Sequence, residues 1–101
     1  MWTELSDPAI LKKIGSRMRD YRMRMEMTQG ELAEKSGVSM GTIVRMEQGC
    51  AISTLLFISV LRTIGLLENL EVMLPELSIS PIQMRKMQMK KIQRIRHRKE
   101  D

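Results

Sequence analysis

Residues 28–49, TQGELAEKSGVSMGTIVRMEQG, constrain the fold of this chain more than any other segment. Thr28 can cap a helix, and Glu31, three residues later, completes a capping box. Gly37 follows where a helix that ends in the left-handed conformation favours glycine. Ser39 can then cap another helix. The segment therefore predicts two short helices joined by a tight turn.

Capping residues and helical spacing predict three further helices. Asp7 is a good N-cap before Pro8, Ser53 can cap a later helix, and Pro75 stops the last one. The expected helices span about residues 8–25, 29–35, 40–47, 54–64 and 66–74. Their expected core-facing residues are Leu11, Ile14, Met18, Tyr21, Met25, Leu32, Ala33, Ile43, Met46, Leu55, Leu56, Ile58, Leu61 and Ile64. We expect an all-α fold, with a domain over residues 1–76 and an appendage over 77–101.

The positive charge of the chain lies in that appendage. Residues 1–80 hold nine Lys/Arg and ten Asp/Glu, whereas residues 81–101 hold eight and two. The net charge of +5 is thus the sum of a nearly neutral body and a strongly basic tail. The body alone gives no general argument for nucleic-acid binding.

The sequence lacks the features of disulfide-bonded, secreted, membrane-spanning and catalytic proteins. Its single cysteine, Cys50, excludes an internal disulfide and suits a reducing cytosol, so we expect a cytoplasmic location. The N-terminus lacks the pattern of a signal peptide, and no apolar run is long enough to span a membrane. The lone histidine, His97, lies in the tail, so we expect no catalytic site, no metal and no cofactor.

The order helix, glycine turn, helix is that of the helix-turn-helix, whose second helix enters the major groove of double-stranded DNA. The run from Ile14 to Gly49 also resembles the Xre family, the lambda and Cro repressor class. The resemblance rests on Gly-x-Arg-hydrophobic-Arg, Thr-Gln-x-Glu-Leu-Ala, Gly-Val-Ser, Thr-Ile and Glu-x-Gly. It implies a five-helix lambda-repressor-like domain with a basic C-terminal tail, acting as a transcriptional repressor. The tail itself is similar to those of some HipB-like antitoxins, which implies a HipA-like kinase toxin as partner.

The resemblance also implies roles for individual residues. Gln29 would brace a phosphate and the recognition helix, and the start of that helix would face base edges. Arg45 would point into the groove one turn later, where an arginine can donate two hydrogen bonds to guanine, worth about 1–3 kcal/mol of discrimination. Met40 cannot form such a pair but could pack on a thymine methyl. The candidate DNA-binding residues are Arg17, Gln29, Ser39, Met40, Gly41, Thr42 and Arg45.

Two of the assignments have open alternatives. Arg22 and Glu47 stand at family positions that form a buried salt bridge between the first and third helices, although Arg22 could instead contact DNA. Arg17 fits phosphate binding and a solvated helix face equally well.

The last expected helix of the body carries more apolar surface than one small core can cover. Its apolar residues are Leu66, Leu67, Leu70, Met73 and Leu74. They could simply cap the core, but we favour a two-fold homodimer interface, to which Trp2 and Leu5 would add. A dimer would place two recognition helices about 34 Å apart, matching a palindromic operator.

The basic tail fits three uses. Its apolar residues divide between two sides of a helix: Ile82, Met89 and Ile92 on one, and Met84, Met87 and Ile95 on the other. That division disfavours a membrane-surface helix and a self-sufficient coiled coil. The tail could order on DNA, fold onto a protein partner, or be helical through dimer contacts. The leading interpretation is a dimeric repressor or antitoxin, and the alternatives are a protein-interaction module or a non-specific nucleic-acid binder.

Overall fold

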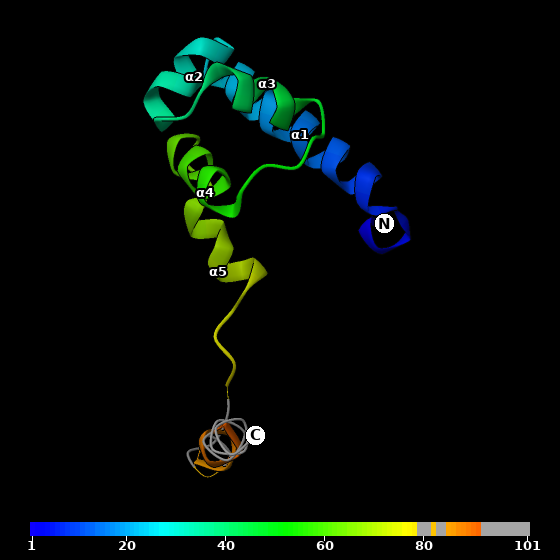
Figure 1. Cartoon of the computed structure of the whole chain (residues 1–101), viewed down its shortest axis with the longest axis vertical. Coiled ribbons are helices and arrows are strands. Elements are labelled where there is room, and N and C mark those ends of the chain that lie inside the picture. The colour runs from blue at the N-terminus through cyan, green and yellow to red at the C-terminus, as the bar shows by residue number, and fades with distance from the viewer. Residues whose placement is uncertain (79–81, 83–84, 92–101) are drawn as a thin grey trace, which may run out of the picture.

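The computed structural model describes residues 1–78, 82 and 85–91, and every regular element in them is helical (Figure 1). The elements are η1 Trp2–Glu4, α1 Asp7–Arg24, α2 Gln29–Ser36, α3 Met40–Glu47, α4 Thr54–Thr63, η2 Leu67–Asn69 and α5 Leu70–Met73, where η marks a 3-10 helix. Residues 82 and 85–91 are helical as well. The predicted all-α class is therefore confirmed for the described part of the chain.

Serine and threonine side chains cap the four longer helices. Thr28 Oγ1 accepts from the Glu31 backbone N–H at 3.1 Å, and Glu31 Oε1 accepts from the Thr28 N–H at 3.2 Å, which completes the predicted capping box. Ser39 and Ser53 cap α3 and α4 as predicted. The predicted cap of α1 is wrong, because Ser6 accepts the Ala9 N–H and the helix already begins at Asp7.

The core lies where α3 packs against α1 and α2, and where α4 packs against α2 (Figure 1). Its buried apolar residues are Met18, Met27, Leu32, Ala33, Ile43, Met46, Val60, Leu61 and Ile64. Three predicted core residues, Tyr21, Met25 and Leu55, are exposed. Leu55 is 73% exposed because it lies five residues before Val60, on the other side of α4.

The backbone of α1 directly contacts the end of α3 at two glycines. A Cβ on Gly15 would press directly on the Met46 carbonyl oxygen and lie 2.9 Å from that of Glu47. A Cβ on Gly49 would lie 2.8 Å from the Lys12 Cα, and Gly49 also has a φ of +88°. The C-terminal end of α3 is thus positioned on α1 by backbone contact as well as by side chains.

The predicted single helix over residues 66–74 is divided into η2 and the one-turn α5. Leu66, just before η2, and Leu67 and Leu70, which begin η2 and α5, are half-buried against the core. Residues 75–78 then run extended, and the helical residues 85–91 lie beyond α5, away from the bundle (Figure 1). The predictions for Met84, Ile92, Ile95 and His97 fall outside the described residues.

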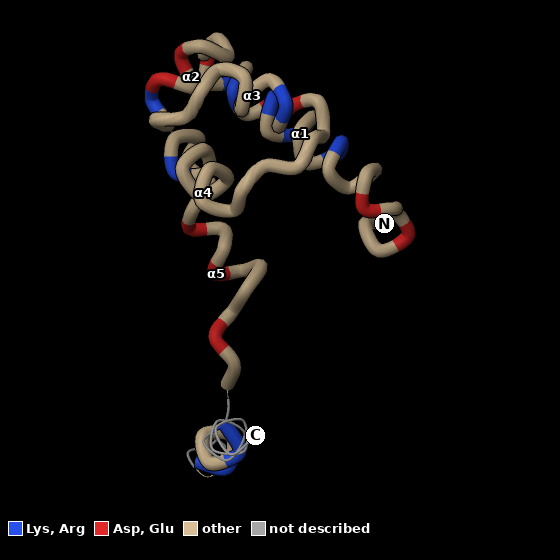
Figure 2. The backbone as a smooth tube through the Cα atoms, viewed as in Figure 1, with Lys and Arg blue, Asp and Glu red and all other residues tan. Residues whose placement is uncertain are grey.

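Charge is distributed along the described chain much as the sequence indicated. Figure 2 shows Lys and Arg on α1, α2, α3, α4 and the helical tail segment, while the charged residues around α5 are all acidic. None of the helices in the described residues is both long and apolar enough to cross a membrane.

Candidate nucleic-acid interface

One face of α3 is open to solvent and the other is packed into the domain. Ser39, Met40, Gly41, Arg45 and Gln48 are exposed, with Met40 at 55%. The inward face consists of Thr42, Ile43 and Met46, and Val44 is half-buried. Because the inward residues hold the helix to α1 and α2, the exposed face can meet a partner without rearrangement of the fold.

A short chain of hydroxyl groups orients Arg45. The Ser39 hydroxyl accepts the Thr42 backbone N–H at 3.1 Å and lies 2.8 Å from the Thr42 hydroxyl. Arg45 Nη2 in turn donates to Thr42 Oγ1 at 3.5 Å. Thr42 is only 4% exposed, so its hydroxyl is placed to support Arg45 rather than to meet a base edge itself.

Gly41 gives the Arg45 guanidinium room to lie along the surface of the helix. A Cβ at this position would stand 3.2 Å from Arg45 Nη1, closer than most real Cβ contacts. Gly41 was predicted to face base edges, and its visible effect is on the conformation of the neighbouring arginine.

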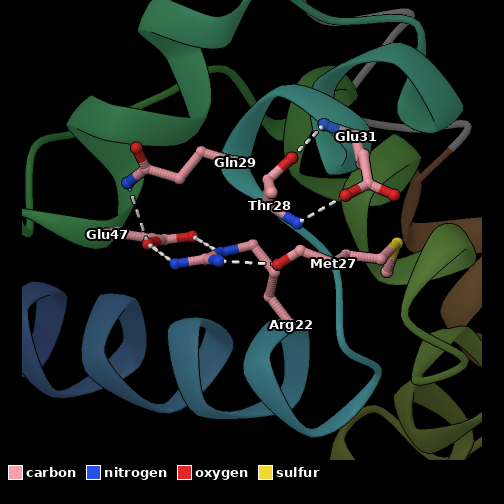
Figure 3. Close-up of polar contacts among 6 residues, drawn as sticks. All are labelled: Arg22, Met27, Thr28, Gln29, Glu31 and Glu47. Carbon is pink, nitrogen blue, oxygen red and sulfur yellow. Dashed lines mark hydrogen bonds and ion pairs between the residues drawn. The ribbon is translucent and has the colours of Figure 1, made fainter.

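The C-terminal end of α3 is fixed by a buried ion pair (Figure 3). Arg22 Nε donates to Glu47 Oε2 at 2.8 Å, and Nη2 donates to Oε1 at 3.0 Å. Arg22 Nη1 also donates to the Met27 carbonyl at 2.7 Å, so the arginine joins α1, α3 and the loop before α2. The hydrogen bond to Glu47 raises the pKa of Arg22, even though its burial acts in the opposite direction. Arg22 is therefore positively charged, and its charge is paired with Glu47 inside the domain.

Gln29 links the same cluster to α2. Its Nε2 donates to Glu47 Oε1 at 3.2 Å, so the start of α2 is tied to the end of α3 (Figure 3). The structure thus gives Gln29 the bracing contact with the recognition helix that the resemblance implied.

A polar hollow of about 490 Å³ lies beside the exposed face of α3. Its lining residues are Arg19, Arg22, Thr28, Gln29, Val44, Glu47 and Gln48. Since Glu47 neutralises Arg22, the exposed Arg19 supplies the positive charge of this hollow. We did not assign Arg19 or Gln48 from the sequence. The spacing of Arg19 three residues before Arg22 was a usable signal, because such residues share a helix face.

Arg17 does not face this hollow in the structure. Its guanidinium carbon lies 5.0 Å from the centre of the Trp2 ring, and Lys13 Nζ lies 4.2 Å from the same ring. These cation–π contacts place Trp2 on α1 of its own chain, whereas the sequence predicted it across a dimer interface. Arg17 remains exposed.

The predicted interface residues fall into two groups. Leu66, Leu67 and Leu70 are half-buried on the core, while Met73 and Leu74 are exposed, Met73 at 63%. An open apolar hollow of about 190 Å³, here called the edge groove, is lined by Tyr21, Phe57, Leu61, Leu66, Asn69, Leu70 and Met73. The last helical turns therefore both cap the core and leave an apolar edge.

Comparison with known proteins finds one family model that matches the part of the chain containing α3. Residues 18–66, which are 49 of the 101 residues, match the family model described as Helix-turn-helix. No curated protein matches the chain. The match begins inside α1, includes α2, α3 and α4, and ends before η2. Residues 18–66 are thus similar to a helix-turn-helix domain, over the same helices for which the sequence predicted this motif.

Proposed function

We propose that the protein is a homodimeric repressor that acts by occupying a palindromic operator. The observation that supports this most strongly is that α3 is held firmly on its inner face and is exposed on its outer face. Its inner face is fixed by the Arg22–Glu47–Gln29 cluster, while its outer face is exposed with Arg45 held on Thr42. A rigid helix with a pre-oriented arginine suits direct readout in the major groove.

In this proposal the residues have distinct tasks. Arg45 donates to a guanine, and Met40 packs on a thymine methyl. Gln29 and Arg19, at the polar hollow, bind the phosphates that fix the helix in register, and Arg17 binds a phosphate from the side of α1. Ser39 contacts DNA at the helix start, whereas Thr42 and Gly41 act through Arg45.

We propose a dimer because the body has no excess of basic side chains over acidic ones. Residues 1–80 have one acidic residue more than basic ones, so a single copy offers few phosphate contacts. Two copies double both the phosphate contacts and the base contacts. The exposed apolar residues Met73 and Leu74, next to Leu66, Leu67 and Leu70, form the proposed interface.

The resemblance of the tail adds a finer proposal, in which the protein is the antitoxin of a HipBA-like pair in the cytoplasm. It would repress its own operon and neutralise a HipA-like kinase toxin. The alternative functions are a protein-interaction module and a non-specific nucleic-acid binder. They differ from the lead proposal in predicting no preferred DNA sequence.

Selection of bound sequences from a random DNA pool by the full chain tests the proposal. We expect enrichment of a palindrome, and Arg45→Ala should lose the preference at one symmetric base-pair position. Arg62→Ala is the matched control, because Arg62 is an exposed arginine on α4, outside the hollow and α3. No enriched sequence, or an identical preference in Arg45→Ala, would refute the groove assignment. Neutralisation of a kinase toxin encoded next to the gene would support the antitoxin role.

A further inference from the structure

The helical segment beyond α5 lies outside the helix-turn-helix and leaves apolar side chains uncovered. Residues 82 and 85–91, here called the arm, are exposed at every described position, including Ile82, Met87 and Met89. Figure 1 shows residues 85–91 apart from the bundle. An exposed apolar side chain on a helix of this kind gains free energy only when it is covered.

The arm carries a pattern that suits an apolar groove with an acidic border. Ile82, Arg85, Lys86 and Met89 follow the spacing i, i+3, i+4 and i+7, which places them on one helix face. Ile82 and Met89 then lie one above the other along the helix, with Arg85 on one side of them and Lys86 on the other. Lys91 and Met87 fall outside this face.

The edge groove has the complementary pattern. Its lining is apolar apart from Asn69 and the Tyr21 hydroxyl. Residues 66–77, which provide Leu66, Leu70 and Met73 to the groove, also contain three glutamates and no lysine or arginine. Glu68 and Glu71 are exposed on the same two short helices. The groove volume of about 190 Å³ admits a side chain but lies below the roughly 300–1,000 Å³ of small-molecule sites.

We infer that the arm of one copy lies in the edge groove of a second copy, with Ile82 and Met89 on its apolar lining, Lys86 beside Glu71 and Arg85 beside Glu68. This rests on the proposed dimer and adds what holds it together. The seven residues 75–81 before the arm can span at most about 25 Å, enough to cross a two-fold axis next to α5. Because the arm lies apart from its own bundle, its exposed face is free to meet the groove of a partner. Each copy gives one arm and receives one, as two-fold symmetry requires.

Disulfide trapping between full-length chains tests the register of this contact. One chain carries Met73→Cys and the other Met89→Cys, both with Cys50→Ser because Cys50 is exposed. The mixture should form a covalent heterodimer at least about five times faster than a mixture with Met87→Cys, the matched control on the other side of the arm. Equal rates would overturn the proposal. So would a chain with both cysteines that oxidises only within itself, because the arm would then occupy its own groove.

Charge reversal tests the chemistry of the contact. Glu71→Lys should raise the dimer Kd about tenfold to a hundredfold in sedimentation at 0.15 M salt, since the change acts twice across the axis. Adding Lys86→Glu should restore much of the affinity, and Lys91→Glu should not. If Lys86→Glu instead leaves the dimer unchanged and weakens binding to all DNA sequences, the arm binds phosphates and the proposal is wrong.

The same measurements separate this inference from the proposed repressor. A chain that dimerises and binds its palindrome but shows no register in the trapping experiment refutes the arm contact and leaves the repressor standing. A full chain that sediments as a monomer at micromolar concentration refutes the dimer and, with it, the arm contact.

Discussion

Substitution by alanine should have opposite effects on stability at Gly15 in α1 and at Gly30 in α2. Gly15→Ala places a methyl group directly against the Met46 carbonyl and near that of Glu47, and backbone atoms cannot rotate away. Overpacking of this kind costs typically about 1–3 kcal/mol. The better helix propensity of alanine recovers up to about 1 kcal/mol. We therefore expect a net loss of about 1–2 kcal/mol in the free energy of unfolding.

Gly30→Ala is the matched control. Gly30 also lies within a helix, but its added Cβ would meet only Thr28 Oγ1, at the ordinary distance of 3.9 Å. The substitution should stabilise the protein by about 0.4–1 kcal/mol. Thermal unfolding followed by circular dichroism measures both variants, and each kcal/mol should move the Tm by about 4–8 °C. Gly15→Ala should also weaken operator binding, because α3 moves. A stabilised Gly15→Ala variant with normal operator affinity would refute the close contact between α1 and α3.

Two further predictions concern the contacts that hold and orient α3. Glu47→Gln should lower the free energy of unfolding by about 3–5 kcal/mol, since Arg22 loses its buried partner, whereas Gln29→Ala removes one hydrogen bond to that carboxylate and should cost about 1–3 kcal/mol. Urea unfolding checks the ranking, and equal effects of the two substitutions would contradict the cluster as described. Thr42→Val keeps the shape of the side chain and removes the acceptor for Arg45, so we expect weaker discrimination at the guanine position with an unchanged salt dependence of binding. Competition between operator variants measures this, and unaltered discrimination would mean that Thr42 does not orient Arg45.

The helices were predictable from local signals because their ends are set by single residues. Thr28, Gly37, Ser39 and Ser53 each act within a few residues of the chain, so the sequence contains what their geometry requires. The wrong cap of α1 shows the limit of this argument. Ser6 and Asp7 are adjacent and both can cap, and nothing local chooses between them.

What the sequence could not supply depends on contacts between helices. Gly15 was part of a motif, but its packing against the α3 carbonyls appears only when α1 and α3 are placed together. Thr42 was assigned to the DNA surface because it lies at the start of α3, and its burial under Arg45 depends on how the helix is rotated. Arg19 was overlooked because α1 carries many basic residues, and only the hollow distinguishes it from the others.

In the proposed complex, the α3 helices of two copies bind successive turns of the major groove on the same face of the DNA. Hydroxyl-radical footprinting of the full chain on its selected sequence tests this most directly. We predict two protected half-sites whose centres are about 10–10.5 base pairs apart, with Arg45→Ala abolishing the pattern at concentrations where Arg62→Ala retains it. Uniform protection along the DNA, or a single protected half-site, would contradict the account.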